Sequence, residues 1–192
     1  VITLPEELIY RYTDKVYPIS YDTFSERDYR DTFIEEGELY LTPQGSLGSP
    51  ISIDPLVLYW NRDTLSAKGL VAPPKSWEEL LVMTPKIVEK DSSGNIRKSA
   101  IAFGEMRNVT HAKDVLSMLF IGAGNPVVTE KDGKFVSVLD ENLGFSLRPG
   151  EEALRFYTEF SNPVKQTYSW NKSLPPSRDM FIAGNLAFYF GY

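Results

Sequence analysis

The sequence has 192 residues, enough for one large domain or for parts of two, and about a quarter of them are charged. The net charge is −6 and the Lys and Arg residues are scattered, which argues against a nucleic-acid partner. The absence of cysteine excludes a disulfide scaffold and a thiolate nucleophile, and no apolar run is long enough to predict a membrane span.

The first 50 residues predict two helices and then mostly irregular chain. Apolar side chains at helical spacing predict a helix over residues 5–15. Ser25, with Asp28 three positions later, is typical of the start of a second helix. A short strand is expected over residues 39–41, and the Gly- and Ser-rich residues 44–50 are expected to form a mobile loop.

Residues 51–80 carry the most informative pattern of the chain. An apolar run predicts a buried strand over residues 51–59, but Pro55 has no amide proton for the ladder, so the strand must bend or start there. Asn61 is expected to cap a short helix over residues 63–68, which the following glycine ends.

The rest of the chain alternates helices and strands. Ser76 and Glu79 form a capping box that predicts another helix, and Pro85 is expected to kink or delay it. Strands separated by helices predict an α/β arrangement. The further expected elements are a turn over 91–95, a strand over 99–103, a helix over 111–121, a hairpin over 126–140 turning at Asp132-Gly133, a helix over 151–160, a short helix capped by Ser177 and a buried strand over 186–190.

Two separate motifs, in this order, resemble one known family. Residues 58–65 (LYWNRDTL) and 73–79 (PPKSWEE) resemble the first crossover between lobes in the family-1 extracellular solute-binding proteins of ABC importers, the maltose-binding-protein-like group. Residues 180–188 (MFIAGNLAF) are similar to the segment before the strand that returns to the hinge in that family. Residues 44–49 depart from the family pattern as an insertion.

The resemblance implies a fold, a domain division and a function. The implied fold is α/β, periplasmic-binding-protein-like type II, mostly the second lobe with the tail of the first. Residues 1–50 are then the incomplete C-terminal part of the first lobe, and residues 51–192 the hinge crossover and the incomplete second lobe. The implied function is that of a non-catalytic component of an ABC importer. It would bind a carbohydrate-like solute between the lobes, work with ABC permease subunits, and need no cofactor or metal.

The resemblance also implies an extracellular or periplasmic location. Val1 and the residues after it lack the basic start and the cleavage site of a signal peptide. Membrane attachment is therefore expected only through a leader or a lipoprotein anchor that is absent from this chain.

Polar side chains in two segments are candidate ligand contacts. Asp54 is a carboxylate in an apolar strand, which requires a partner such as backbone or Arg, or else a ligand. Glu105 and Asn108, with Arg107 between them, follow the strand over 99–103, at the strand end where α/β folds hold ligands. A solvated turn is the alternative interpretation for Glu105 and Arg107.

Two aromatic side chains are candidate stacking platforms. Tyr168 and Trp170 lie in a polar, proline-bounded loop, and flat aromatic faces suit the apolar face of a sugar ring. Trp170→Ala is therefore expected to weaken binding while leaving stability nearly unchanged, unless Trp170 belongs to the core. Tyr192, at the hinge return, is a further candidate.

Two other functions stay open at this point. One is a non-catalytic interaction module on the same scaffold. The other is a glycoside-processing enzyme using Asp54 and Glu105, which is disfavoured because no residue supplies a nucleophile or holds a metal. His111 is the only histidine, which argues against a zinc site and indicates a surface or capping residue.

Overall fold

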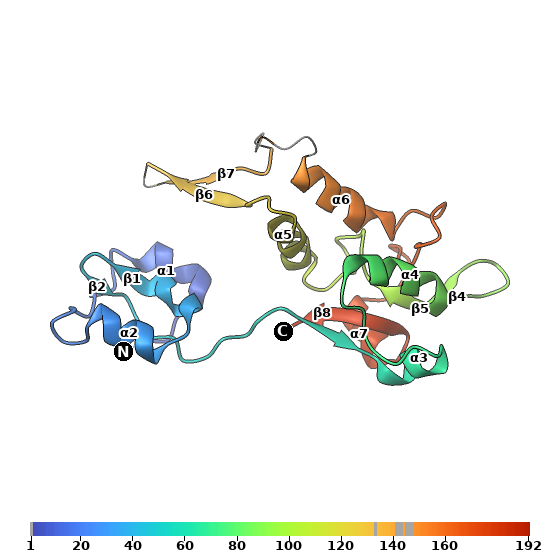
Figure 1. Ribbon diagram of the computed structural model, residues 1–192, viewed down its shortest axis with the longest axis horizontal. Coiled ribbons are helices and arrows are strands. Elements are labelled where there is room, and N and C mark those ends of the chain that lie inside the picture. Colours follow the sequence, from blue (N-terminus) through green and yellow to red (C-terminus); the bar gives the residue numbers. More distant parts are fainter. Residues whose placement is uncertain (1, 133, 141–143, 145–147) are drawn as a thin grey trace. The chain divides into compact units, whose positions relative to one another are not determined.

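The computed structural model describes residues 2–132, 134–140, 144 and 148–192. The chain forms two compact units, Val1–Asp54 and Pro55–Tyr192, whose elements are labelled in Figure 1. The division falls after Asp54, a few residues beyond the boundary expected at residue 50. The assignment of these units to two lobes stays a prediction.

The first unit is built from short elements around one tyrosine. Ser25 caps the second helix as predicted, since its Oγ accepts a hydrogen bond from the Asp28 amide at 3.1 Å. Tyr29 is buried, and its hydroxyl lies 3.1 Å and 3.0 Å from the carbonyl oxygens of Gly37 and Gly48. Burial raises the pKa of Tyr29 to about 12. The elements are α1 (Glu6–Tyr12), α2 (Glu26–Thr32), the 3₁₀ helix η1 (Glu35–Tyr40), β1 (Leu41–Thr42) and β2 (Gly45–Ser46).

The predicted loop over residues 44–50 contains a short strand, β2. Ser46 is buried and exchanges two backbone hydrogen bonds with Ile19, of 2.8 Å and 3.0 Å. Gly45 permits this approach, because a Cβ atom there would lie 2.2 Å from the Ile19 carbonyl oxygen. Gly45 thus allows close backbone pairing in a segment whose Gly and Ser content predicted a loop. The strand expected over residues 39–41 is also displaced, because the 3₁₀ helix runs to Tyr40.

The second unit contains a four-stranded sheet in the order β3-β8-β5-β4. β5 and β8 run parallel, with Ser99 opposite Leu186 and Ile101 opposite Phe188, and the two outer pairs are antiparallel. A separate hairpin, β6–β7, confirms the expected one, although Gly133 of its predicted turn lies outside the described residues. The elements are β3 (Val57–Trp60), α3 (Arg62–Ala67), α4 (Trp77–Ile87), β4 (Glu89–Lys90), β5 (Ile96–Ile101), α5 (Ala112–Gly122), β6 (Val128–Lys131), β7 (Lys134–Ser137), α6 (Pro149–Glu159), α7 (Ser177–Ile182) and β8 (Leu186–Gly191).

Two apolar clusters cover the sheet. In Figure 1, α4, α5 and α6 lie on one side of it and α7 on the other. The larger cluster joins helices α3 to α6 to the sheet, and the smaller one joins α7, the loop before α7 and the start of α5 to it. The larger cluster includes Leu65, Leu80, Ile87, Ile101, Phe103, Val115, Leu119, Tyr157, Phe160 and Phe188; the smaller includes Ala102, Val109, Trp170, Met180, Leu186 and Tyr189.

Local signals at the helix starts are largely confirmed. Asn61 accepts from the Thr64 amide at 2.9 Å, and Ser76 accepts from the Glu79 amide at 3.3 Å. Pro85 lies inside α4 without ending it. Ser177 does not cap α7 but is its first residue. In the described part of the chain, no helix is both long and apolar enough to span a bilayer.

The strand predicted over residues 51–59 is much shorter than expected. It begins only at Val57, after Pro55, and Ile51 is 82% exposed. Asp54 is likewise exposed and outside any strand. The argument that its carboxylate needs a buried partner therefore does not hold.

Candidate functional site

The carboxyl ends of β5 and β8 form one edge of the sheet. They are parallel neighbours, so the loop that leaves β5 and the end of β8 emerge side by side. Ligands of α/β folds bind at such edges. This edge is therefore the candidate site, and it is built entirely within the second unit.

The loop after β5 is fixed through its backbone. The Tyr157 hydroxyl donates to the Glu105 carbonyl oxygen at 2.6 Å, and burial raises the pKa of Tyr157, which keeps this donor protonated. Gly104 has a φ of +90°, and a Cβ there would lie 2.4 Å from Ser161 Oγ, so the loop packs directly against the end of α6. The backbone of this loop is therefore well positioned.

The charged side chains of the same loop can take part in ligand binding. In the described parts of the chain, neither Glu105 nor Arg107 forms a side-chain hydrogen bond or an ion pair. Glu105 is partly exposed and Arg107 is exposed. A carboxylate offers only acceptors and a guanidinium only donors, so together they can bind hydroxyl groups in either sense.

Asn108 differs from these two charged residues. Its Oδ1 accepts from Trp170 Nε1 at 3.1 Å, and its Nδ2 donates to the carbonyl oxygens of Asn171 and Leu174, both at 2.9 Å. Both protons of the amide nitrogen are thus used within the protein. Asn108 joins the loop after β5 to the loop before α7.

Trp170 is completely buried. It packs in the smaller apolar cluster, with Met180 and Leu186 among its members. In this structure its ring presents no face to a solute, so burial supports the core alternative for Trp170. It also reverses the expectation that Trp170→Ala would leave stability unchanged.

Tyr168 also lies away from the carboxyl edge. Its hydroxyl accepts from Asn171 Nδ2 at 2.9 Å, and Lys90 Nζ lies 4.9 Å from its ring centroid. Lys90 belongs to β4, which pairs with the beginning of β5. Among the five predicted contacts, the structure joins Asn108 to Trp170, places Glu105 in the same loop as Asn108, and places Tyr168 beside β4; Asp54 belongs to the first unit.

Sequence reasoning missed Ser169 as a structural residue. Its buried Oγ accepts from the amides of Ala100 and Ile101 at 2.9 Å and 3.1 Å, and it lies 3.0 Å from Ser99 Oγ. Its carbonyl oxygen accepts from Ser99 Oγ at 2.7 Å. Ser169 thus provides a hydrogen-bond acceptor for amides of β5 that lie beyond the residues paired with β4. A small polar residue before a tryptophan carries no sequence signal for this role.

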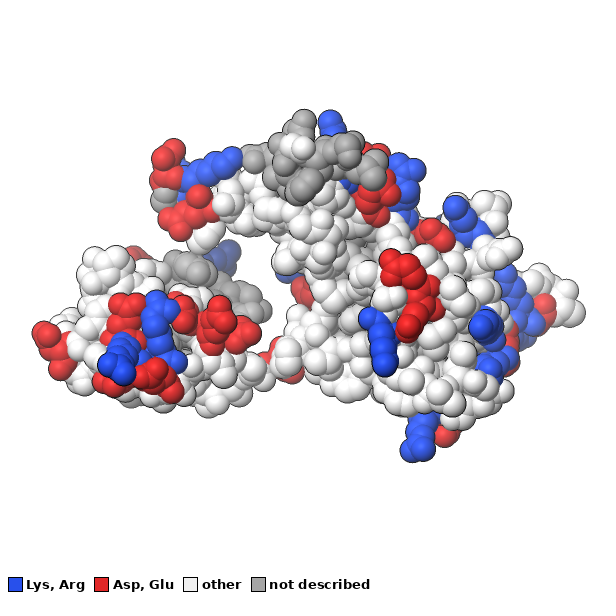
Figure 2. All heavy atoms as spheres, in the orientation of Figure 1, with Lys and Arg blue, Asp and Glu red and all other residues white. Residues whose placement is uncertain are grey.

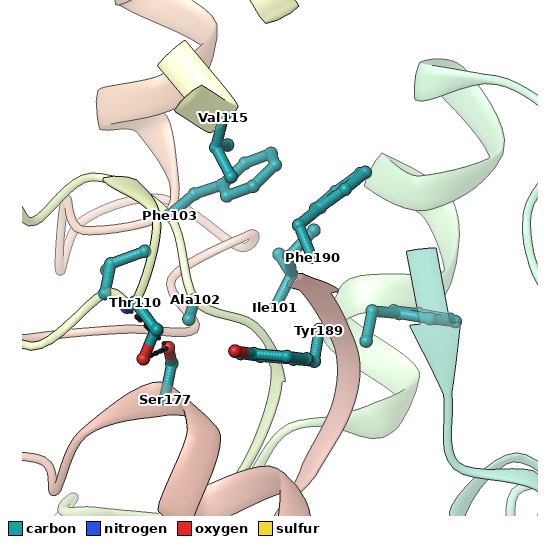
Figure 3. Close-up of a pocket in the computed structure, with 10 residues that line it drawn as sticks. Ile101, Ala102, Phe103, Thr110, Val115, Ser177, Tyr189 and Phe190 are labelled. Atoms are coloured by element: carbon teal, nitrogen blue, oxygen red, sulfur yellow. Dashed lines mark hydrogen bonds between the residues drawn. The ribbon is translucent and has the colours of Figure 1, made fainter. Parts of the chain in front are cut away.

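A small cavity of about 10 Å³ lies at the same edge (Figure 3). Most of its lining is apolar, from β5, β8 and α5, but Thr110, Ser177 and Tyr189 contribute hydroxyl groups. The buried strand expected over residues 186–190 thus contributes one hydroxyl group to the lining, that of Tyr189.

Two aromatic rings meet at the end of β8. His111 and Tyr192 are in edge-to-face contact, with ring centroids 4.9 Å apart. His111 occupies the N-cap position of α5 in a left-handed conformation (φ 60°) and makes no side-chain capping bond. Its Nδ1 lies 3.7 Å from an Asp114 carboxylate oxygen. The histidine expected at a helix start thus contacts the ring of Tyr192, a further candidate for ligand contact.

The surface charge agrees with a small-molecule site better than with a polyanion site. On the face shown in Figure 2, acidic and basic side chains are interspersed over the second unit, and that face carries no continuous basic surface. A nucleic-acid footprint requires Lys and Arg to cluster on one face or along one helix.

Comparison with known proteins identifies the family. Residues 12–192 match the model of the bacterial extracellular solute-binding proteins, so the chain belongs to that family. In fold it is similar to the crystal structure of an ABC transporter solute-binding protein from Thermotoga lettingae TMO bound with α-D-tagatose. The similarity covers 71% of this chain, with a TM-score of 0.51 and 23% sequence identity. The chain spans 32% of the length of that structure. The α/β fold of periplasmic-binding-protein type is thereby confirmed.

Proposed function

We propose that this chain serves as part of the extracellular solute-binding component of an ABC importer and binds a carbohydrate-like solute without converting it. Family membership over residues 12–192 supports the transport class. In this proposal the ABC permease subunits are its protein partners. The location is extracellular or periplasmic, with a lipoprotein anchor in the full-length protein.

One structural observation carries the choice of site. The loop after β5 holds Glu105 and Arg107 at the carboxyl edge of two parallel strands, without side-chain partners in the described residues, while its backbone is bonded to Tyr157. Because the backbone of this loop is already fixed, its charged side chains can exchange bound water for ligand hydroxyl groups with little loss of conformational entropy. Specific sites use a small number of such placed polar groups.

The chemistry of this edge favours a polyhydroxylated solute. Glu105 supplies acceptors and Arg107 donors for paired hydroxyl groups, and the rings of His111 and Tyr192 add flat apolar surface. The ketohexose bound to the Thermotoga protein is of this class, which makes D-tagatose a rational first ligand to test.

The other predicted contacts take different places in the proposal. Asn108 and Trp170 hold the loop in position through their 3.1 Å hydrogen bond. Asp54 and Tyr168 stay predictions from the sequence. For Asp54, the proposal keeps the expected role of a carboxylate that contacts a solute held between two lobes.

An NMR titration of the ¹⁵N-labelled chain tests the proposal. D-Tagatose, a panel of other sugars, glycerol phosphate and a polyamine are added in turn. At least one sugar is expected to shift the amide signals of residues 104–108 and of Tyr192, and the sugar spectrum is expected to stay unchanged over time. Glu105→Gln should reduce these shifts, whereas Glu130→Gln, an exposed glutamate on β6, should leave them intact.

Two outcomes would contradict the proposal. A new product in the sugar spectrum would indicate catalysis. Shifts confined to surfaces other than this edge, or shifts only with the polyamine or the phosphate ester, would remove the carbohydrate site assigned to Glu105 and Arg107.

A further inference from the structure

The small cavity behind the carboxyl edge has both a size and a polarity that limit its occupant. Its volume is about 10 Å³, which is near the lower limit for one water molecule and too small for a larger group. Apolar residues such as Phe103, Val115 and Phe188 form most of the wall. An occupant must therefore be a single small molecule that bonds to the few polar groups present.

Tyr189 provides the first of these polar groups. Its side chain is only 9% exposed, and in the described residues its hydroxyl has no hydrogen-bond partner. Figure 3 shows the hydroxyl directed away from β8 toward Thr110 and Ser177. The hydroxyl oxygen is not among the buried side-chain atoms that lack a partner, so water can reach it and can serve as its hydrogen-bond partner at the cavity.

Thr110 and Ser177 provide the other polar groups. The hydrogen bonds between them leave one donor and one acceptor unused. Ser177 Oγ accepts from the Thr110 amide at 2.9 Å and donates to Thr110 Oγ1 at 3.2 Å. The Thr110 hydroxyl proton has no acceptor among the described residues, and Ser177 Oγ keeps a second lone pair. The opposite wall of the cavity thus offers one donor and one acceptor.

We propose that this cavity binds one ordered water molecule, held between the hydroxyl groups of Tyr189 and Thr110 with Ser177 as a third partner. Ordered waters in such sites typically form about three hydrogen bonds to protein groups, and three hydroxyl groups line this cavity. The inference goes beyond the proposed function, because the water is held by protein groups alone and does not depend on a solute.

The water joins three elements that are distant in sequence. Tyr189 belongs to β8, Thr110 precedes α5, and Ser177 is the first residue of α7, whose amide also donates to the Asn108 carbonyl oxygen at 2.8 Å. It therefore connects the central strand to the loop that holds Asn108, in addition to the direct bonds to that loop.

A high-resolution crystal structure of the 192-residue chain tests the inference, together with the variant Tyr189→Phe. Density for one water is expected within hydrogen-bonding distance of the Tyr189 and Thr110 hydroxyls, and it should be lost in Tyr189→Phe. The melting temperature of the variant should fall by about 2 to 4 °C, as for the loss of one hydrogen bond. Tyr59→Phe is the matched control, because Tyr59 lies opposite Tyr189 on β3 and does not line the cavity.

Thr110→Val is a second variant in case Tyr189→Phe does not fold, and it should also lose the water. Absence of density in the unmodified chain would overturn the inference, as would a water that persists in either variant. In solution, a long-lived water contact to the Thr110 amide is expected in NMR spectra of the unmodified chain and of Tyr59→Phe only. Its presence in Tyr189→Phe would count against the proposed site.

Discussion

The two loops bonded together next to β5 use their polar side chains in opposite ways. Residues 104–108 leave the charged groups of Glu105 and Arg107 unpaired within the described residues. Residues 167–171 use their polar groups internally: Thr167 Oγ1 donates to Glu159 at 2.8 Å, and Ser169 accepts two amides of β5.

This difference shows why composition alone misassigned the second loop. Two aromatic residues, Tyr168 and Trp170, in a polar, proline-bounded segment are typical of a site that stacks against a sugar ring. The same pattern is typical of a loop that packs against a sheet and hydrogen-bonds to it. The pattern cannot separate the two because both need aromatic surface beside hydrogen-bonding groups. Burial separates them, since Trp170 is fully enclosed.

Of the substitutions in the two loops, Trp170→Ala should reduce the stability of the chain most. Removing a fully buried indole is expected to lower the free energy of unfolding by about 3–5 kcal/mol. Guanidinium unfolding of the variant measures this loss. Trp77→Ala is the matched control, because Trp77 is 40% exposed and should cost clearly less. Equal, small losses for both tryptophans would return Trp170 to the role of an exposed platform.

Ser169→Ala should have the next largest effect. It leaves the amides of Ala100 and Ile101 buried without an acceptor, at an expected cost of about 2–4 kcal/mol for the two donors together. Urea unfolding gives the stability, and amide hydrogen exchange at these two residues should accelerate. Ser173→Ala, at an exposed position further along the same loop, should change neither quantity. Unchanged protection in Ser169→Ala would contradict the assigned role.

Asn108→Ala should weaken the bonds between the loops. The variant removes the acceptor of the Trp170 indole proton and two donors to backbone carbonyls, with an expected cost of about 1–3 kcal/mol. Faster hydrogen exchange of the Trp170 indole is the specific readout, with the Trp77 indole as an internal reference. Loss of solute binding at full stability would instead make Asn108 a ligand contact.

Glu105→Gln and Arg107→Ala should affect stability least. Surface substitutions without partners usually change it by no more than about 0.5 kcal/mol. Both variants are nevertheless expected to lose most of the sugar-induced NMR shifts. A large destabilisation from either one would show that the first loop is as internally bonded as the second, and the contrast between the loops would disappear.

Local chemistry determined a large part of the fold from sequence. Side-chain caps at Ser25, Asn61 and Ser76 start helices where predicted, because a cap satisfies amides only a few residues away. The alternation of helices and strands and the two motifs around residues 58–79 and 180–188 led to the correct fold class and family. Such signals depend on neighbours in the chain, so they can be read without knowing the tertiary structure.

Only the tertiary structure decided which polar and aromatic residues face inward. Ser169 meets Ala100, and Trp170 meets Asn108, across more than sixty positions of sequence. Gly45 lies against the backbone of Ile19, and Tyr189 reaches a cavity shared with two other elements. These outcomes follow from which segments the folded chain brings into contact, and a side chain's own type and spacing do not contain that information.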